Sequence, residues 1–422
     1  MTAADPLTGD DPLVERFRTL WAELAGIGRD PATGGYLRYA WSPAELACRD
    51  WFVAEATNRG LTVRADGNGN LWADWVPAGV NPAGPAVVTG SHFDSVPHGG
   101  GYDGPLGIVS ALLAVDELRE QGFVPARPVI VAAFAEEEGS RFGLACLGSR
   151  LLTGGVTAAR ALALTDAAGV MLAEAMRAAG ADPAAAGPDP ARLARIGVFV
   201  ELHVEQGRAL VDLDAPVGVA SMIWPHGRWR LEFTGAGDHA GTTRMVDRRD
   251  PMLTCAHTVL AADANARWLG GHATIGRVEV RPNATNAVPA QVHAWLDARA
   301  ADPRTLAELV EAITADATAR AASDGTTVTV TPESDSPLVA FDPALAEQIR
   351  TAIGSGLRVD VPVLPTAAGH DAGILAGHVP TAMIFVRNPT GVSHAPGEYA
   401  TDDDCAAGVR ALAAALAELA AE

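Results

Sequence analysis

Four apolar, strand-like segments of the chain each run directly into a loop that carries acids or a histidine. In chain order, the segments and the loops after them read "PAVVTG" and "SHFDS", "VIVAAFA" and "EEEG", "FVEL" and "HVEQG", and "MIFV" and "RNPTGVSH". In open α/β sheets, ligands bind at the edge where the carboxyl ends of the strands meet. We therefore expect an α/β catalytic layer in which these loops share one site.

The first of these loops, "GSHFDSVPHGGGYDGPLG" at residues 90–107, contains six glycines and leads into an apolar helical pattern. The two-residue period of a strand predicts that His92 and Asp94 lie on the same side, so that the carboxylate can fix the tautomer of the ring. Asp103, framed by glycines, could reach back to the same place. Metal ligands are often held in this way, although a hydrogen-bonded histidine beside a glycine-rich turn is the alternative.

The other three loops supply further candidate ligands. Three successive glutamates, Glu136 to Glu138, follow a strand that is apolar on both faces, where adjacent carboxylates repel one another unless a cation is present. A solvated acidic turn is the alternative. His203 lies in a third apolar strand, and His394 follows a fourth.

Together these residues form the ligand inventory of a two-metal hydrolase. One carboxylate can bridge two ions, and Glu137 is left free as a general base. The five candidate ligands are His92, Asp103, Glu138, His203 and His394.

Composition restricts the other functions that the chain can have. A formal net charge of −20 argues against a surface that binds phosphate backbones, so we expect no nucleic-acid partner. We expect no membrane segment and no secretory signal, which makes the cytoplasm the default location. The four cysteines are scattered, as is typical of reduced structural thiols.

The complete absence of lysine is more restrictive, because all 31 basic residues are arginines. It excludes Schiff-base catalysis, the P-loop and a metal bridge made from carbamylated lysine.

The pattern of elements changes near residue 218. The following segment predicts the order β-α-β-β-α-β, which matches a ferredoxin-like unit, and strands of the first type resume after about residue 332. With 422 residues, two domains are expected. We predict a mostly parallel-sheet metallohydrolase domain from residues 1–217 and 333–422, with residues 218–332 inserted as a lid and dimerisation domain.

Eight ordered motifs resemble the hydantoinase/carbamoylase family of dinuclear metal amidases, which is related to aminoacylases and metal-dependent carboxypeptidases. They cover nearly the whole chain and read "GSHFDSV", "GGYDGPLG", "EEGSRFG", "ELHVEQG", "GDHAGTT", "RPNATNAVP", "AAGHDAG" and "GVSHAPGE".

The resemblance implies a role for each matched residue. His92, Glu138, His203 and His394 would bind two divalent ions, manganese or zinc, with Asp103 as the bridge. Asp94 would orient His92, and Glu137 would be the catalytic base. Five further residues would bind substrate, and one of them, His239, would also assist catalysis. The lid residues would reach into the site of the neighbouring subunit of a homodimer. The substrate residues are His239, Asn283 and Arg299 in the lid and Gln206 and His370 outside it.

The implied reaction is cleavage of a ureido C–N bond of a small acid, with release of ammonia and carbon dioxide. The motifs are most similar to those of family members that act on allantoate. Arg299 could bind a carboxylate with a bidentate fork, and Asn283 could satisfy both ends of a ureido group. An N-carbamoyl-L-amino acid or ureidopropionate is the alternative substrate. A peptidase, or a binding protein that has lost its chemistry, is a more distant hypothesis.

One position departs from the family pattern. Many relatives have proline where this chain has Arg244, so we expect the contacts just after His239, which bear on the identity of the substrate, to differ from those of these relatives. His226 is a second possible specificity residue, although an ordinary histidine at a strand entrance is the simpler interpretation.

Overall fold

The structure, a computed structural model, describes residues 11–421 and divides into two compact units. The smaller unit comprises Met222–Val339 and Pro365–Ala368, and the larger unit contains the rest of the described chain. The boundaries expected from the sequence, near 218 and 332, fall inside strands β6 (Val217–Ile223) and β12 (Thr327–Ser336). The first boundary of the units, between Ser221 and Met222, lies inside β6, where the pattern of the strand continues without a loop. The second lies within the two-residue strand β13 (Val339–Ala340), shortly after the end of β12.

The larger unit is built on a mixed sheet, which is nine-stranded within the described residues. Strand β14 (Val363–Thr366) pairs with β6 at the side of the main path. Along that path the strands follow the order β1 (Thr62–Ala65), β2 (Leu71–Trp75), β4 (Val129–Phe134), β3 (Ala86–His92), β5 (Ile196–Val204), β15 (Thr381–Val386), β6 and β13 (Val339–Ala340).

The four central strands, β4, β3, β5 and β15, are parallel to one another, whereas β2 and β6 run antiparallel on either side. These four are the strands that the sequence predicted before the polar loops, and the mostly parallel α/β sheet is confirmed. Because they are parallel, their carboxyl ends lie at one edge of the sheet.

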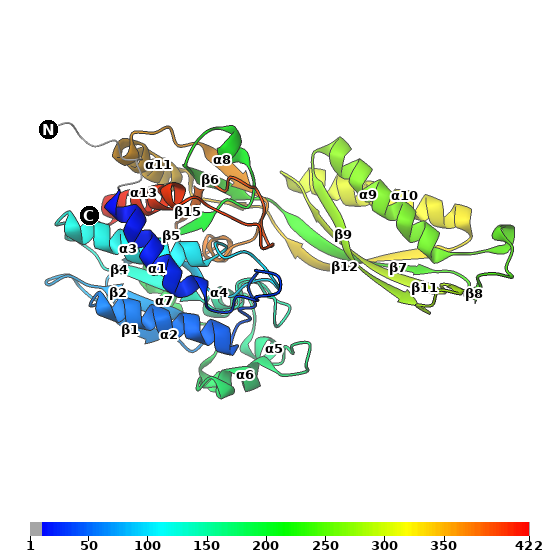
Figure 1. Ribbon diagram of the computed structural model, residues 1–422, viewed down its shortest axis with the longest axis horizontal. Helices are drawn as coiled ribbons and strands as arrows, with labels where there is room; N and C mark the ends of the chain where they lie inside the picture. The colour runs from blue at the N-terminus through cyan, green and yellow to red at the C-terminus, as the bar shows by residue number, and fades with distance from the viewer. Residues whose placement is uncertain (1–10, 422) are drawn as a thin grey trace. The chain divides into compact units, whose positions relative to one another are not determined.

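Helices cover both faces of this sheet (Figure 1). Alternate residues of β5, namely Val198, Val200 and Leu202, belong to the core that also contains α3 and α13, whereas Glu201 accepts a hydrogen bond from the first turn of α12. The helices of this unit are α1 (Pro12–Ala25), α2 (Pro43–Asn58), α3 (Pro105–Glu120), α4 (Leu147–Thr153), α5 (Ala158–Leu162), α6 (Leu172–Ala178), α7 (Pro190–Arg195), α8 (Ala209–Asp212), α11 (Pro343–Leu357), α12 (Asp371–Leu375) and α13 (Asp402–Ala420).

The smaller unit has the predicted β-α-β-β-α-β order. It comprises β7 (His226–Thr234), α9 (Pro251–Leu269), β9 (His272–Arg281), β11 (Gln291–Arg299), α10 (Pro303–Asp324) and β12. The four strands form an antiparallel sheet in the order β12-β7-β11-β9, and a short ribbon of β8 (Asp238–His239) and β10 (Ala287–Val288) is attached at one end (Figure 1).

Local sequence explains both helices of the smaller unit. Each follows an aspartate whose side chain accepts at least one backbone N–H of the first turn, each has proline as its first residue, and each ends at a glycine with positive φ. Their apolar faces pack on one face of the sheet around Leu231, Phe233, Leu296 and Leu309. In the described part of the chain, no helix is long and apolar enough to cross a membrane.

Candidate metal centre

The predicted ligands gather at the carboxyl edge of the parallel strands. His92 is the last residue of β3, and His203 is the last but one of β5. Glu138 follows β4, and His394 follows β15 after a loop. Asp103 lies in the loop that leads into α3, and its carboxylate reaches back to the strand ends.

The glycines of the first loop allow this close approach. Gly104 has a φ of +84°, and a Cβ there would lie 2.5 Å from Cε1 of His92. A Cβ on Gly100 would lie 2.3 Å from Oε1 of Glu398. The bare backbone of the loop is therefore what brings Asp103 beside the imidazole of His92.

The carboxylate of Asp103 lies between three histidines. Its Oδ1 is 3.2 Å from Nε2 of His203 and 3.6 Å from Nε2 of His92, whereas its Oδ2 is 3.3 Å from Nε2 of His394. Glu138 Oε2 lies 3.6 Å from the same atom of His394. The geometry thus defines an inner subsite (His92, His203 and Oδ1 of Asp103) and an outer subsite (Glu138, His394 and Oδ2 of Asp103).

The donor atoms of the inner subsite fit a cation. Nδ1 of His92 lies 3.0 Å from the carbonyl of Asp94, and Nδ1 of His203 lies 2.9 Å from that of Val204. If each Nδ1 donates its proton there, each Nε2 presents a lone pair to the carboxylate of Asp103. Both Nε2 atoms, and Oε1 of Glu138, are buried without a hydrogen-bond partner. A divalent cation in each subsite would satisfy these buried acceptors.

The electrostatics of the cluster favour positive charge. Burial alone would raise the pKa of Asp103, but the adjacent imidazoles of His203, His394 and His92 hold it well below its ordinary value. Burial opposes protonation of His394, yet Asp103 and Glu138 raise its pKa to about 9. Burial and the neighbouring Asp103 raise the pKa of Glu138 to about 7.

Glu137 lies beside the inner subsite and is placed differently from Glu138. Its Oε2 is 3.7 Å from Nε2 of His92, and the thiol of Cys146 lies 3.7 Å from its Oε1. Burial, with repulsion from Glu138 and Asp371, raises its pKa well above the ordinary value although His92 opposes this. A carboxylate with a raised pKa is suited to accept and return a proton near neutral pH.

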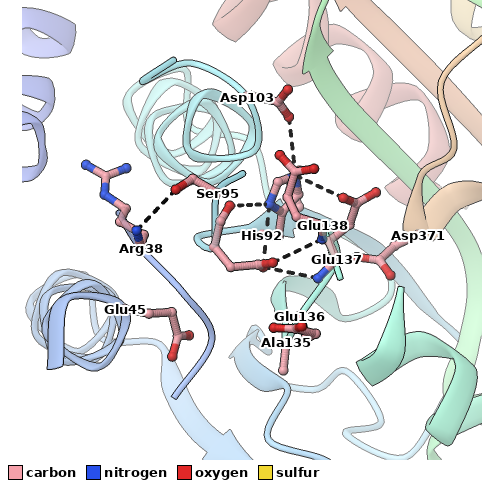
Figure 2. A network of polar contacts seen from close by, with 12 residues as sticks. Arg38, Glu45, His92, Ser95, Asp103, Ala135, Glu136, Glu137, Glu138 and Asp371 are labelled. Carbon is pink, nitrogen blue, oxygen red and sulfur yellow. Dashed lines mark hydrogen bonds and ion pairs between the residues drawn. The ribbon is translucent and has the colours of Figure 1, made fainter. Parts of the chain in front are cut away.

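Asp94 acts on two neighbours through different atoms. Its carbonyl faces Nδ1 of His92, whereas its carboxylate lies 3.6 Å away from that nitrogen. The carboxylate instead accepts the backbone N–H groups of Glu137 at 3.1 Å and Glu138 at 3.0 Å. The sequence assigned the orientation of His92 to the carboxylate; in the structure the carboxylate holds the loop of Glu137 and Glu138. Figure 2 shows both glutamates beside His92.

The first glutamate of the run has a structural role. Glu136 is buried, has a φ of +54°, and accepts the backbone N–H groups of Arg141 and Phe142 on Oε1. Burial raises its pKa to about 8, with repulsion from Asp94 as the second cause. It therefore closes the turn after β4.

Gln206 and His370 bring unpaired polar atoms to the cluster. The amide nitrogen of Gln206 donates to Oδ2 of Asp103 at 2.7 Å, and its Oε1 is buried without a partner. The ring of His370 lies 4.4 Å from that of His203, and neither of its nitrogens has a hydrogen-bond partner. Burial and the nearby His203 hold the pKa of His370 well below its ordinary value, so its ring is neutral.

Several residues around the cluster were not predicted. Glu201 accepts hydrogen bonds from Ser91 and from the backbone of Ala372, and Ser149 donates to Asp371. Glu398 binds the backbone of the Asp103 loop. The sequence contained signals for two of them, since Glu201 precedes His203 by one strand period and Glu398 ends the "HAPGE" motif.

Arg299 lies at the end of the smaller unit where the chain enters and leaves it. It pairs with His226 on β7, four residues after the first residue of the unit. Its Nε and Nη2 donate to the carboxylate of Asp297 at 2.8 and 3.1 Å, and its Nη1 donates to the carbonyl of Ala367 at 2.6 Å. Three of its five N–H groups are engaged, which leaves two for a ligand.

His239 and Asn283 are at the opposite end of the same sheet. His239 pairs with Ala287 in the β8 and β10 ribbon, and Asn283 follows Arg281, the partner of Gln291. From Gln291 to Arg299 the strand spans about 26 Å at its usual rise. Gly241 and Thr242 donate their N–H groups to Nδ1 of His239, so the exposed Nε2 carries the proton. One copy of this unit therefore does not bring the three residues around one small ligand.

His226 and Arg244, the two candidate specificity residues, are also in the smaller unit. Nδ1 of His226 lies 3.1 Å from the backbone carbonyl of Trp224, so this ring is held by the backbone. Arg244 makes a bidentate ion pair with Asp247, at 2.6 and 2.9 Å, and is 76% exposed.

Comparison with known proteins gives consistent matches. Residues 88–418 match the model of peptidase family M20/M25/M40. The N-carbamoyl-L-amino acid amidohydrolase of Geobacillus stearothermophilus is 35% identical, over 94% of this chain and 96% of its own length. The allantoate amidohydrolase of Escherichia coli is 34% identical, over 94% of this chain and 96% of its own length. A crystal structure of a hydantoinase/carbamoylase family amidase from Burkholderia multivorans superposes with a TM-score of 0.83 and 32% identity, covering 97% of this chain and 98% of that one.

Proposed function

The chain belongs to the hydantoinase/carbamoylase amidases of peptidase family M20 and is a metal-dependent amidohydrolase of ureido or carbamoyl groups; on this premise we propose that its substrate is allantoate. The proposed ions would be held by His92, His203 and Asp103 on the inner side and by Glu138, His394 and Asp103 on the outer side. Bound there, divalent ions such as Mn²⁺ or Zn²⁺ lower the pKa of water and polarise a carbonyl oxygen.

Glu137 carries the proton transfers in this proposal. Its carboxylate takes the proton of the attacking water and returns it to the terminal nitrogen of the ureido group, so that the C–N bond breaks and ammonia leaves. The carbamate that remains loses carbon dioxide. The raised pKa of Glu137 and its position 3.7 Å from His92 support this assignment.

The observation that carries the choice of substrate is the set of unpaired polar atoms beside the cluster. Oε1 of Gln206 and both ring nitrogens of His370 are buried, have no partner, and are not among the proposed metal ligands. Allantoate has two ureido groups and one carboxylate on a single carbon, so its second ureido group can bind these atoms. An apolar side chain would leave them unpaired, at ~1–3 kcal/mol each.

A side-by-side assay of ammonia release tests the substrate. The Mn²⁺-loaded protein is given allantoate, ureidoglycolate, N-carbamoyl-L-amino acids and ureidopropionate, and kcat/KM is compared. We expect allantoate to have the highest value. A higher kcat/KM for a carbamoyl amino acid with an apolar side chain would reject allantoate and leave the amidase mechanism in place. Gln206→Ala should lower kcat/KM for allantoate more than for that carbamoyl amino acid.

We also propose that the smaller unit binds substrate and joins two subunits. Its edge strand β9 has no partner on one side among the described residues. Helix α9 packs against β9 and exposes Leu253, Leu260 and Trp268, which are 46, 70 and 86% exposed. A free strand edge beside an apolar helix face suits pairing with a second copy about a two-fold axis.

A dimer would also explain the separation of the substrate residues. Because Arg299 and the pair His239 and Asn283 lie at opposite ends of one sheet, we propose that they serve two different sites. In this proposal, Arg299 binds the carboxylate of the substrate in its own subunit, whereas the resemblance implied that all three lid residues act on the neighbouring site. His239 and Asn283 then bind the ureido group in the partner subunit.

A further inference from the structure

We propose that Glu398 is a positioning residue that holds Asp103 between the two subsites and thereby controls the occupancy of the outer one. The inference rests on the metal ligands proposed above and adds a residue that is not among them. Glu398 is 5% exposed and lies four residues after His394.

Glu398 binds the backbone of the bridging residue itself. Its Oε1 accepts the N–H groups of Tyr102 and of Asp103, both at 2.9 Å. Its Oε2 lies 3.4 Å from the hydroxyl of Ser393, which lies at the same distance from Oδ2 of Asp103. One buried carboxylate therefore ties the loop of Asp103 to the loop of His394, although the two are almost 300 residues apart.

The loop is shaped to receive this side chain. A Cβ on Gly100 would lie 2.3 Å from Oε1 of Glu398 and 2.4 Å from its Cβ, so only glycine fits. Residues 99–101 are all glycine, and such a backbone has many alternative conformations. The two N–H bonds to Glu398 select the one conformation in which the carboxylate of Asp103 faces both subsites.

The effect should be larger in the outer subsite. The inner subsite has two histidines that lie in β3 and β5 and are fully buried. The outer subsite depends on Glu138, His394 and Asp103, all of which lie in loops, and the side chain of His394 is 49% exposed. Loss of the Glu398 contacts would free the loops of two outer ligands, Asp103 and His394. Of the three inner ligands it would free only Asp103.

The experiment measures Mn²⁺ binding to the full chain by equilibrium dialysis, without substrate. We expect Glu398→Ala to weaken the second ion by about 10-fold or more, the usual size for a residue that orients a metal ligand, and to weaken the first ion less. Glu398→Gln keeps an oxygen that can accept both N–H groups, so it should recover most of the affinity. The matched control is Asp342→Ala, because Asp342 also accepts two successive N–H groups, of Ala344 and Leu345, but at the start of α11.

A second variant distinguishes a specific loss of metal binding from misfolding. Gly100→Ala keeps the carboxylate of Glu398 but places a methyl group against it, so it should reproduce the selective loss of the second ion. Unchanged binding of both ions in Glu398→Ala, or equal weakening of both ions in Glu398→Ala and Gly100→Ala, would overturn the inference. An equal loss of the second ion in Asp342→Ala would also overturn it.

The ligand set is tested separately by His394→Ala, which should bind one ion where the unmodified protein binds two. If it binds two, the proposed metal site is wrong, and the role of Glu398 is wrong with it. If it binds one while Glu398→Ala binds two with unchanged affinity, only the role of Glu398 is rejected.

Discussion

Glu137 and Glu136 are adjacent buried glutamates with different surroundings. Glu137 faces His92 at 3.7 Å, whereas Glu136 faces the turn after β4 and accepts two backbone N–H groups. The sequence does not show which of the two adjacent glutamates faces the site, because successive side chains in a turn with positive φ point in unrelated directions.

Replacing Glu137 by glutamine should lower turnover strongly without removing metal. The amide has no basic oxygen, so we expect kcat to fall by about 10²–10⁴-fold, the usual contribution of general base catalysis. Metal content should stay unchanged, because Glu137 is not a proposed ligand. The measurement is steady-state ammonia release together with metal analysis of the same sample.

Glu136→Gln is the matched control for that change. It should stay within a few-fold of the unmodified enzyme, since an amide oxygen can still accept the N–H groups of Arg141 and Phe142. Near-normal kcat in Glu137→Gln would show that another group is the base.

The pKa of His226 predicts how stability depends on pH. Burial lowers this pKa below 6.5, and the nearby Arg299 contributes in the same direction. As pH falls below 6.5, the unfolded chain therefore binds a proton on this residue before the folded chain does, which favours unfolding. The stabilisation is complete above pH 6.5 and is lost as pH falls toward the folded pKa.

Urea denaturation at about pH 7 and pH 5 tests this linkage. His226→Gln, which does not titrate, should lose less free energy of unfolding between the two pH values than the unmodified protein. An equal loss in both proteins would mean that His226 titrates alike in the folded and unfolded states.

At the scale of elements, the loop between β3 and α3 depends on its glycines. Gly104→Ala would place a methyl group 2.5 Å from the ring of His92 at a φ of +84°. We expect it to displace His92 or Asp103 and to lower Mn²⁺ affinity, in addition to a loss of stability. Urea denaturation and equilibrium dialysis measure the two effects separately.

Gly122→Ala separates strain from collision in this comparison. Gly122 follows α3 with a φ of +72°, and a Cβ there meets nothing within 4 Å. It should cost ~1–2 kcal/mol for the left-handed backbone and leave metal binding unchanged. Equal metal affinity in the two variants would show that the contact of Gly104 with His92 does not position the ligand.

At the scale of the whole molecule, the proposed dimer depends on the exposed face of α9. Leu260→Glu and Trp268→Glu would each place a charge in an apolar contact, so we expect them to shift a dimer to monomers in sedimentation equilibrium. Val124→Glu, at a position that is 70% exposed in the larger unit, should not. Dimers that survive both α9 changes would require a different interface.

Mixing inactive subunits tests which residues act on the partner's site. Heterodimers of Glu137→Gln and Asn283→Ala should recover part of the activity, because one site then receives Glu137 from one chain and Asn283 from the other. Heterodimers of Glu137→Gln and Arg299→Ala should stay inactive if Arg299 serves its own subunit. Rescue in the second mixture but not in the first would reverse the assignment.

Periodicity and composition determined the fold class and the place of the site. An apolar strand that ends in a polar loop predicts candidate ligands at its carboxyl end, and parallel strands bring such loops to one edge of the sheet. The parallel sheet, the inserted β-α-β-β-α-β unit and the nearness of His92, His203 and Asp103 could therefore be predicted. The glycines of residues 99–104 indicated close contacts, although not with which groups.

Only the tertiary structure decided how these side chains are oriented and how they are distributed between the two subsites. The two oxygens of Asp103 face different histidines, the carboxylate of Asp94 holds Glu137 and Glu138, and Glu398 holds Asp103. These contacts join residues from distant parts of the chain, and the path of a loop depends on partners that no local pattern contains. Strand register likewise placed Arg299 at one end of a sheet and Asn283 at the other, because antiparallel pairing fixes position along a strand and a motif does not.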